Sequence, residues 1–245
     1  MTTTPKPFSP TDPLTWQPRH LVRSVIAHDV ATTRDRSTAL LAATARAEWG
    51  PETAGMIDAE RLPQDQYGTA RAASLAKFDA QHGSRSIIVA DVSNDVSYKE
   101  DLAKAFGARV ICVSISRNGA SGARARELVA GVPITSYVLG RTELIDGLHA
   151  RMSNGQFVLP QTEISRDAFN ELADLERVIS EAGNVIYKTR AGKHDDLGMS
   201  MAIAAWAINH QDFDAWVAID RQQKIRTGQL RINPRSSRAG SSGWT

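Results

Sequence analysis

Four aspartates stand where apolar segments of the chain begin or end. Asp29 ends the run "LVRSVIAHD", and Asp91 ends "RSIIVAD". The adjacent Asp195 and Asp196 precede "LGMSMAIAAWA", whose apolar residues recur at the spacing of a helix face. An acid in the first turn of a helix can cap it and interact favourably with the helix dipole, which accounts for one of this pair. Ionised carboxylates otherwise repel each other and are poor core residues, so their repetition at three element ends indicates a shared site.

Carboxylates that share a small volume need a positive partner. Hard divalent cations such as Mg²⁺ or Mn²⁺ provide one, because they prefer oxygen ligands. Two such ions about 3.5–4 Å apart can activate a water and stabilise the leaving oxygen of a phosphodiester. Ligand sites in open α/β sheets lie outside the carboxyl ends of strands, so Asp29 and Asp91 converge if their strands are neighbours.

The elements that must position these acids follow from the apolar pattern. Three strands come first, then a helix–strand–helix–strand unit, then helices, which predicts a mixed α/β domain with one central sheet covered by helices. Ala enrichment leaves the second strand open to a helical alternative. The predicted strands are 21–29, 37–47, 54–62, 85–91, 109–116 and a short edge strand within 155–160. The predicted helices are 65–82, 98–107, 141–153, 165–182 and 195–210, and 117–131 is predicted to be a Gly-rich loop.

Composition is that of an ordinary globular protein. The 245 residues are 42% hydrophobic and 23% charged, which suits one soluble α/β domain with appendages. No apolar run is long enough to span a membrane, and the Pro- and Thr-rich start has no signal-peptide core. The single cysteine, Cys112, lies in an apolar run and is predicted to be a small buried hydrophobe. A cytosolic protein is expected.

Positive charge is concentrated at the C-terminus. The formal net charge is only +2, yet residues 221–245 carry six Lys or Arg and no acid. A basic, Ser- and Gly-rich end can be an arm that contacts a polyanion or a tail that keeps the chain soluble.

Four segments, in order, resemble the nuclease domain of the large terminase subunit of tailed bacteriophages. They are "SVIAHDVATTRDRSTALL", "SIIVADVSNDVSYKEDLAKAFGARVICVSIS", "GRTELIDGLHARMSNGQFVLPQTEISRDAFNELADLERV" and "GKHDDLGMSMAIAAWA". The resemblance covers residues 21–211 and implies an RNase H-like α/β fold, with a central mixed β-sheet flanked by helices. Residues 1–20 are then an irregular lead-in, and 212–245 form a basic, flexible arm.

The same resemblance implies the site and the activity. Asp29, Asp91 and Asp195 would bind metal, with Asp196 as an alternative or additional ligand, and Asp35 would cap a turn or support the ligands. The implied activity is a divalent-metal-dependent endonuclease that uses two Mg²⁺ or Mn²⁺ ions to cut double-stranded DNA during viral genome packaging. The expected partners are DNA and a packaging ATPase, portal or small terminase subunit, in the cytoplasm of an infected bacterium and without a membrane.

Two departures from that family stand out. The chain contains no G-x-x-x-x-G-K-[ST] phosphate loop, because Gly192-Lys193 is followed by His194 and lacks the first glycine. The ATP motor is therefore expected on a separate chain or as a part absent from this one. The sequence "DVSNDVSY" also lacks the glycine that many members carry after the second acid.

Other residues near the acids allow both functional and structural roles. His194 can be a ligand, a general base or a surface residue. Lys193 opposes the helix dipole, so it can pair with the acids or hold a phosphate. His28 is expected on the opposite face of the sheet from Asp29. The basic residues that can contact DNA phosphates, or simply face solvent, are Arg117, Arg124, Arg126, Lys224, Arg226 and Arg231.

Three alternatives stay open at this point. Another RNase H-like nuclease, such as a junction resolvase, would prefer branched DNA. A catalytically silent DNA-binding or assembly module would bind DNA without metal, and Asp91→Ala would leave that binding unchanged. A phosphate-transferring enzyme acting on small molecules would need a Gly-rich phosphate loop after a strand, which the chain lacks.

Overall fold

The computed structural model describes residues 7–30, 36–48, 50–64, 66–116, 121–122, 124–181, 183 and 185–230. The sequence predictions for Asp35, Arg117 and Arg231 fall outside these residues.

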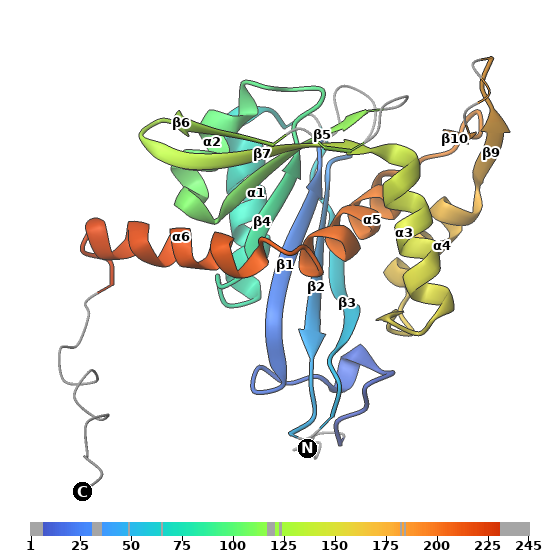
Figure 1. The fold of residues 1–245 in the computed structure, drawn as a ribbon, viewed down its shortest axis with the longest axis horizontal. Coiled ribbons are helices and arrows are strands. Elements are labelled where there is room, and N and C mark those ends of the chain that lie inside the picture. Colours follow the sequence, from blue (N-terminus) through green and yellow to red (C-terminus); the bar gives the residue numbers. More distant parts are fainter. Residues whose placement is uncertain are drawn as a thin grey trace, which may run out of the picture.

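One mixed sheet of eight strands forms the centre of the molecule (Figure 1). Its strand order is β6-β7-β5-β4-β1-β2-β3-β8. The strands β1, β4, β5 and β7 are mutually parallel, whereas β1, β2 and β3 form an antiparallel meander. The bounds are β1 (Leu21–Asp29), β2 (Thr38–Ala45), β3 (Thr53–Arg61), β4 (Ile87–Asp91), β5 (Val110–Ser116), β6 (Arg124–Val129), β7 (Val132–Gly140) and β8 (Phe157–Val158). This is the predicted α/β class with a mixed central sheet.

Helices cover both faces of the sheet. Side chains alternate along each strand, so Val25 and Ala27 of β1 join one core cluster and Ile26 joins the other. The first cluster contains residues of α3 (Arg141–Ser153), α4 (Glu163–Ala173) and α5 (Asp196–Ile208). The second contains residues of α1 (Gly68–Gln81) and α2 (Tyr98–Phe106). Two 3₁₀ turns, Pro13–Thr15 and Gly107–Arg109, complete this part of the chain.

Helix α5 is apolar around its whole circumference because it is covered on all sides. It packs on β1 and β2 and is covered in turn by α3 and α4. The Ala-rich segment 37–47 contributes β2, in which all eight residues are buried. Tertiary packing has therefore overridden the helix preference of alanine there. The predicted strands up to β5, the edge strand β8 and the helices α1, α2, α3 and α5 are confirmed.

Two predicted elements are wrong. The helix predicted for 165–182 ends at Ala173, and Leu175–Ile179 forms strand β9, paired antiparallel with β10 (Val185–Thr189). The predicted Gly-rich loop contains β6, which forms a hairpin with β7. The turn of this hairpin is Ala130-Gly131, with φ of +51° and +77°. Two-residue hairpin turns need positive φ, and alanine seldom adopts it, so the turn carries no standard sequence signal.

The predicted flexible arm does not begin at residue 212, because α6 (Phe213–Arg226) follows directly. Trp216 in its first turn is fully buried and donates a hydrogen bond from Nε1 to the Tyr137 hydroxyl at 3.2 Å. Its indole also stacks on the His210 ring, with centroids 4.9 Å apart. Phe213, also buried, and Trp216 thus anchor the start of a helix that otherwise extends away from the sheet (Figure 1). None of the helices in the described part of the chain has both the length and the apolar composition needed to cross a membrane.

Candidate metal centre

Two of the predicted acids end neighbouring parallel strands. Asp29 is the last residue of β1 and Asp91 the last of β4, and the register pairs them directly. Hydrogen-bonded strands lie about 4.8 Å apart, and residues in register point to the same face. This face is the one that α5 covers, because Ala27 and Val89, two positions earlier, belong to the same core cluster as α5. The predicted convergence of Asp29 and Asp91 is therefore present.

The start of α5 is fixed beside these strand ends. Thr38, which pairs with Asp29 across β1 and β2, donates from Oγ1 to the backbone carbonyl of Asp196 at 3.2 Å. The same hydroxyl lies 2.7 Å from Ser200 Oγ, one turn into the helix. These contacts bring Asp195 and Asp196 to the end of β1 on which Asp29 lies.

The side chain of Asp195 forms its ion pair with a residue outside its own helix. Among the described residues, no backbone N–H of the first turn of α5 donates to its side chain, although Asp195 occupies the N-cap position. Its carboxylate instead forms an ion pair with Arg141, the first residue of α3. Helix capping by the Asp195 side chain therefore does not account for this acid.

Burial makes Asp29 and Asp91 harder to ionise than free carboxyl groups. Burial raises the pKa of Asp29 well above its ordinary value, and the negative charges of Asp91, Asp196 and Asp195 raise it further, while Arg141 lowers it. Burial also raises the pKa of Asp91, which is only 7% exposed. Hydrogen bonds from the backbone N–H of Ser93, at 2.9 Å, and from its hydroxyl oppose that rise.

Without a divalent cation, the stability of the chain should fall as pH rises above about 4, the ordinary carboxyl pKa. The folded state has the higher pKa at Asp29 and Asp91, so it binds more protons than the unfolded chain and loses stability as they are released. Asp29→Asn removes one of the repelling charges. In EDTA at about pH 7.5 it should raise Tm by about 2–4 °C, or about 1 kcal/mol for a chain of this size.

Thermal unfolding followed by circular dichroism at low and neutral pH checks this expectation. The control is Asp214→Asn, because Asp214 has an 81% exposed side chain paired with Arg23 far from the cluster. The repulsion account is wrong if Asp29→Asn lowers Tm at neutral pH, or if both variants shift it equally.

Arg141 is the site residue that sequence reasoning missed. It follows the last residue of β7, and its Nη2 donates to Asp195 Oδ2 and, at 3.3 Å, to Thr189 Oγ1. The side chains of Arg141 and Asp195 are only 17% and 18% exposed. A signal was present, because a cation at the first position of a helix opposes the helix dipole and needs a reason.

The auxiliary residues Lys193 and His194 lie in the loop before α5. Lys193 Nζ forms an ion pair with Asp174 Oδ2 at 3.1 Å, outside the acid cluster. Lys193 and His194 are both exposed. His28 lies on the opposite face of the sheet, as expected, where its Nδ1 is 2.7 Å from the Thr38 carbonyl oxygen and burial lowers its pKa to about 4. His28 is thus a core residue.

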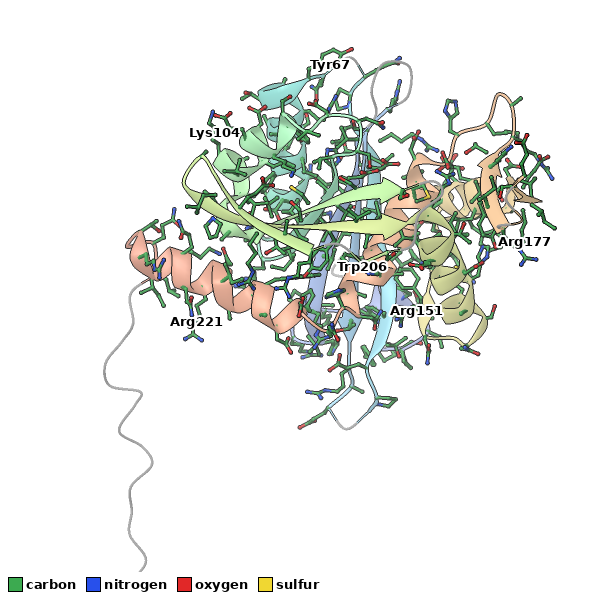
Figure 2. All side chains as sticks on the ribbon, turned by 45° about the horizontal axis from the view of Figure 1, so that its top comes forward. Tyr67, Lys104, Arg151, Arg177, Trp206 and Arg221 are labelled. Carbon is green, nitrogen blue, oxygen red and sulfur yellow. The ribbon has the colours of Figure 1, made fainter. Side chains whose placement is uncertain are left out.

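The predicted basic residues that the structure describes lie on β6 and α6. Arg124 pairs with Asp212 at 2.8 Å, and Lys224 pairs with Asp220 within α6 at 2.7 Å. Arg126 and Arg226 are exposed, on β6 and at the end of α6. Other arginines lie elsewhere on the surface: in Figure 2, Arg221 of α6 and Arg177 of β9 appear on opposite sides of the molecule.

Cys112, predicted to be a small buried hydrophobe, is buried, and burial raises its pKa to about 12.

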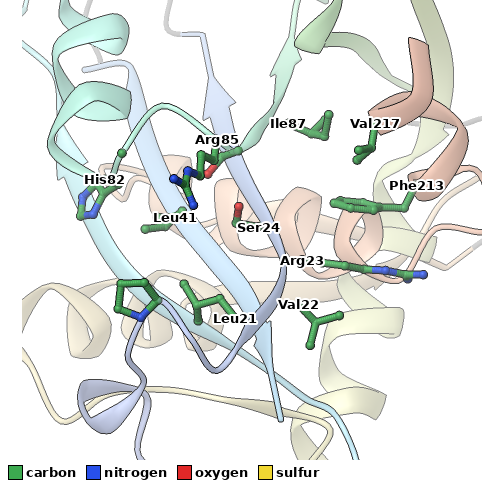
Figure 3. Close-up of a pocket in the computed structure, with 13 residues that line it drawn as sticks. Leu21, Val22, Arg23, Ser24, Leu41, His82, Arg85, Ile87, Phe213 and Val217 are labelled. Carbon is green, nitrogen blue, oxygen red and sulfur yellow. The ribbon is translucent and has the colours of Figure 1, made fainter. Parts of the chain in front are cut away.

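A cavity of about 500 Å³ lies at the other end of the sheet (Figure 3). It is lined by the segment 21–24 and by Ile87, which are the first residues of β1 and β4, whereas the acids end these strands. Its described lining residues include Arg23, Arg85 and His82 but no acid. The cavity is therefore separate from the acid cluster.

The donor chemistry of the cluster suits a hard divalent cation, because every candidate ligand is a carboxylate. Within the residues that the structure covers, however, no three acidic, His or Cys side chains already stand in a ready metal-binding arrangement. Asp195 is held by Arg141, and the remaining carboxylates repel one another. A bound cation would have to draw these side chains together.

The sequence matches no family model and no curated protein. The fold, however, is similar to that of the large terminase nuclease from thermophilic phage G20c with bound magnesium, with a TM-score of 0.52 and 18% identity over 78% of this chain and 82% of that one. It is also similar to the nuclease domain of the large terminase subunit gp2 of bacterial virus Sf6, with a TM-score of 0.52 and 10% identity over 80% and 94% of the two chains.

A third similar structure is the Mn-soaked human cytomegalovirus terminase nuclease domain, with a TM-score of 0.50 and 9% identity over 81% of this chain and 88% of that one. At such identities the similarity concerns the fold. The chain therefore has the predicted RNase H-like fold, in the form found in large terminase nuclease domains.

Proposed function

We propose that the chain is a divalent-metal-dependent endonuclease that cuts double-stranded DNA during viral genome packaging. The observation that carries this proposal is the register of β1 and β4, which places Asp29 opposite Asp91 beside the Asp195–Asp196 start of α5. Support also comes from the terminase nuclease fold and from the metal ions named in the similar phage and cytomegalovirus structures.

In this proposal Asp29, Asp91, Asp195 and Asp196 hold the cations, and two ions are expected because four carboxylates can share them. When bound, Mg²⁺ or Mn²⁺ acts as a Lewis acid on the phosphodiester and makes water a better nucleophile. Metal ligands must be deprotonated, so a bound cation would favour the ionised forms of Asp29 and Asp91.

Neighbouring residues hold Asp91 in place for this task. Ser93 donates to its Oδ1 from both the backbone and the hydroxyl, and the backbone N–H of Ile115 donates to Ser93 Oγ at 2.6 Å. One carboxylate oxygen is thus tied to the end of β5, which leaves Oδ2 for a cation. Contacts to the DNA backbone carry no sequence information, so little sequence preference is expected. Partners such as a packaging ATPase, portal or small terminase subunit would restrain cutting in the host cytoplasm.

The test is incubation of supercoiled plasmid with the purified chain in Mg²⁺, in Mn²⁺ and in EDTA. Nicked and linear plasmid should appear with either metal, and EDTA should stop their formation, because the carboxylates alone supply no Lewis acid. A four-way junction offered beside a linear duplex separates a packaging nuclease from a junction resolvase. Metal-independent DNA binding by folded protein, with no cutting in either metal, would instead favour a catalytically silent module.

A further inference from the structure

We propose that Arg141 is the internal counter-ion of the metal centre and competes with a divalent cation for the carboxylate of Asp195. The cation binds only when Arg141 releases that carboxylate. This inference rests on the metal site in the proposed function and adds a residue that controls its occupancy.

The geometry places Arg141 at the junction of three elements. It begins α3, its Nη2 donates to Asp195 at the start of α5, and the same nitrogen donates to Thr189 at the end of β10. Both charged side chains are more than four-fifths buried, so solvent screens their attraction only weakly. Among the described residues, Arg141 Nε has no hydrogen-bond partner, and the hydrogen bonds to Asp195 and Thr189 are both donated by Nη2.

The charge of Arg141 also reaches the other acids. Arg141 directly follows β7, whose last residue Gly140 is in register with Ser116 at the end of β5, so Arg141 lies at the same edge of the sheet as Asp29 and Asp91. A guanidinium at this position supplies the positive charge that the carboxylates need when no metal is bound. A divalent cation among the same carboxylates would meet a like charge a few ångströms away, which weakens its binding.

A purely structural ion pair makes a different prediction. Removing one partner of a buried pair leaves an uncompensated charge and destabilises the fold, without any gain in metal binding. Competition predicts that loss of the Arg141 charge makes cation binding tighter, even where it lowers the stability of the metal-free chain.

Isothermal titration of Mg²⁺ and Mn²⁺ into Arg141→Gln distinguishes the two roles. The Kd for each metal should fall at least about tenfold relative to the unsubstituted chain. Arg23→Gln is the matched control, since Arg23 forms its ion pair with Asp214 away from the acids, and its Kd should not change. An unchanged or higher Kd for Arg141→Gln, in protein that circular dichroism shows to be folded, overturns the proposal.

A second measurement uses the unsubstituted chain, so it does not depend on a variant folding. Phenylglyoxal modifies accessible arginines, and peptide mass spectrometry locates the products. Modification of Arg141 should be slow in EDTA and rise several-fold in saturating Mg²⁺, because the metal frees the guanidinium from Asp195. Arg23 should react equally in both conditions. Equal reactivity of Arg141 in EDTA and in Mg²⁺ would contradict the release of this residue.

The proposal and the metal site on which it rests can fail separately. Asp91→Asn should weaken cation binding in the same titration because it removes a ligand. If Asp91→Asn has no effect, the metal site is wrong. If Asp91→Asn abolishes binding while Arg141→Gln leaves the Kd unchanged, the site stands and only the role of Arg141 is wrong.

Discussion

Asp91→Asn should reduce metal-dependent plasmid cleavage by at least about a thousandfold. A metal ion contributes several kcal/mol of charge stabilisation in phosphodiester hydrolysis, and each 1.36 kcal/mol is a factor of ten in rate. The substitution keeps the shape of the side chain and an oxygen that accepts the hydrogen bonds from Ser93, so the end of β4 should remain folded. What is lost is the anionic ligand opposite Asp29.

Asp95→Asn is the matched control for this loss. Asp95 lies four residues further along the same loop, and its carboxylate pairs with Arg71 on the α1 side of the sheet rather than with the acid cluster. Cleavage rates are measured under single-turnover conditions with Mg²⁺ and with Mn²⁺. If Asp91→Asn keeps more than about a tenth of the rate, or if Asp95→Asn loses as much, Asp91 is not a metal ligand.

Trp216→Ala should destabilise the chain by about 3–5 kcal/mol, the range for truncating a large buried aromatic side chain. Trp216 is fully buried, and the variant loses both the hydrogen bond from its indole to Tyr137 and the stacking on His210. Chains of this size change Tm by about 2–4 °C per kcal/mol, so Tm should fall by about 10 °C.

The neighbouring Val217→Ala is the control for this prediction, because Val217 is 44% exposed. Its effect should stay within about 0.5 kcal/mol, as for most surface substitutions. Urea unfolding, monitored by far-UV circular dichroism so that the signal does not depend on tryptophan fluorescence, gives the free energy of unfolding of each variant. Equal stability of the two variants would mean that α6 is dispensable for the fold and that the folded domain ends before residue 213.

The parts of the fold that the sequence predicts are those in which one strong pattern acts alone. Short apolar runs ending at Asp29 and Asp91 could be interpreted as buried strands, and the general rule for open α/β sheets then placed their ends together. Helix α5 was predictable because its apolar residues recur at helical spacing over a segment that is too long for a typical strand. For these elements local preference and tertiary packing agree.

The parts that escaped prediction depend on contacts between distant segments. Ala130 adopts a left-handed conformation that only the pairing of β6 with β7 imposes. Nothing in the polar C-terminal sequence marks Trp216 as buried. Its burial depends on Tyr137, which is distant in sequence and packs with His210 around the indole. Arg141 shares no local motif with Asp195, 54 positions away, so only the fold joins them.

The most direct test of the account is a crystal of the chain soaked in Mn²⁺, with the metal located by its anomalous scattering. We expect a peak between the carboxylates of Asp29 and Asp91, at about the 2.0–2.2 Å ligand distances of small divalent cations, with Asp195 turned away from Arg141. A chain that binds Mn²⁺ only elsewhere, with the Arg141–Asp195 pair intact, would contradict the assignment of this acid cluster as a metal centre.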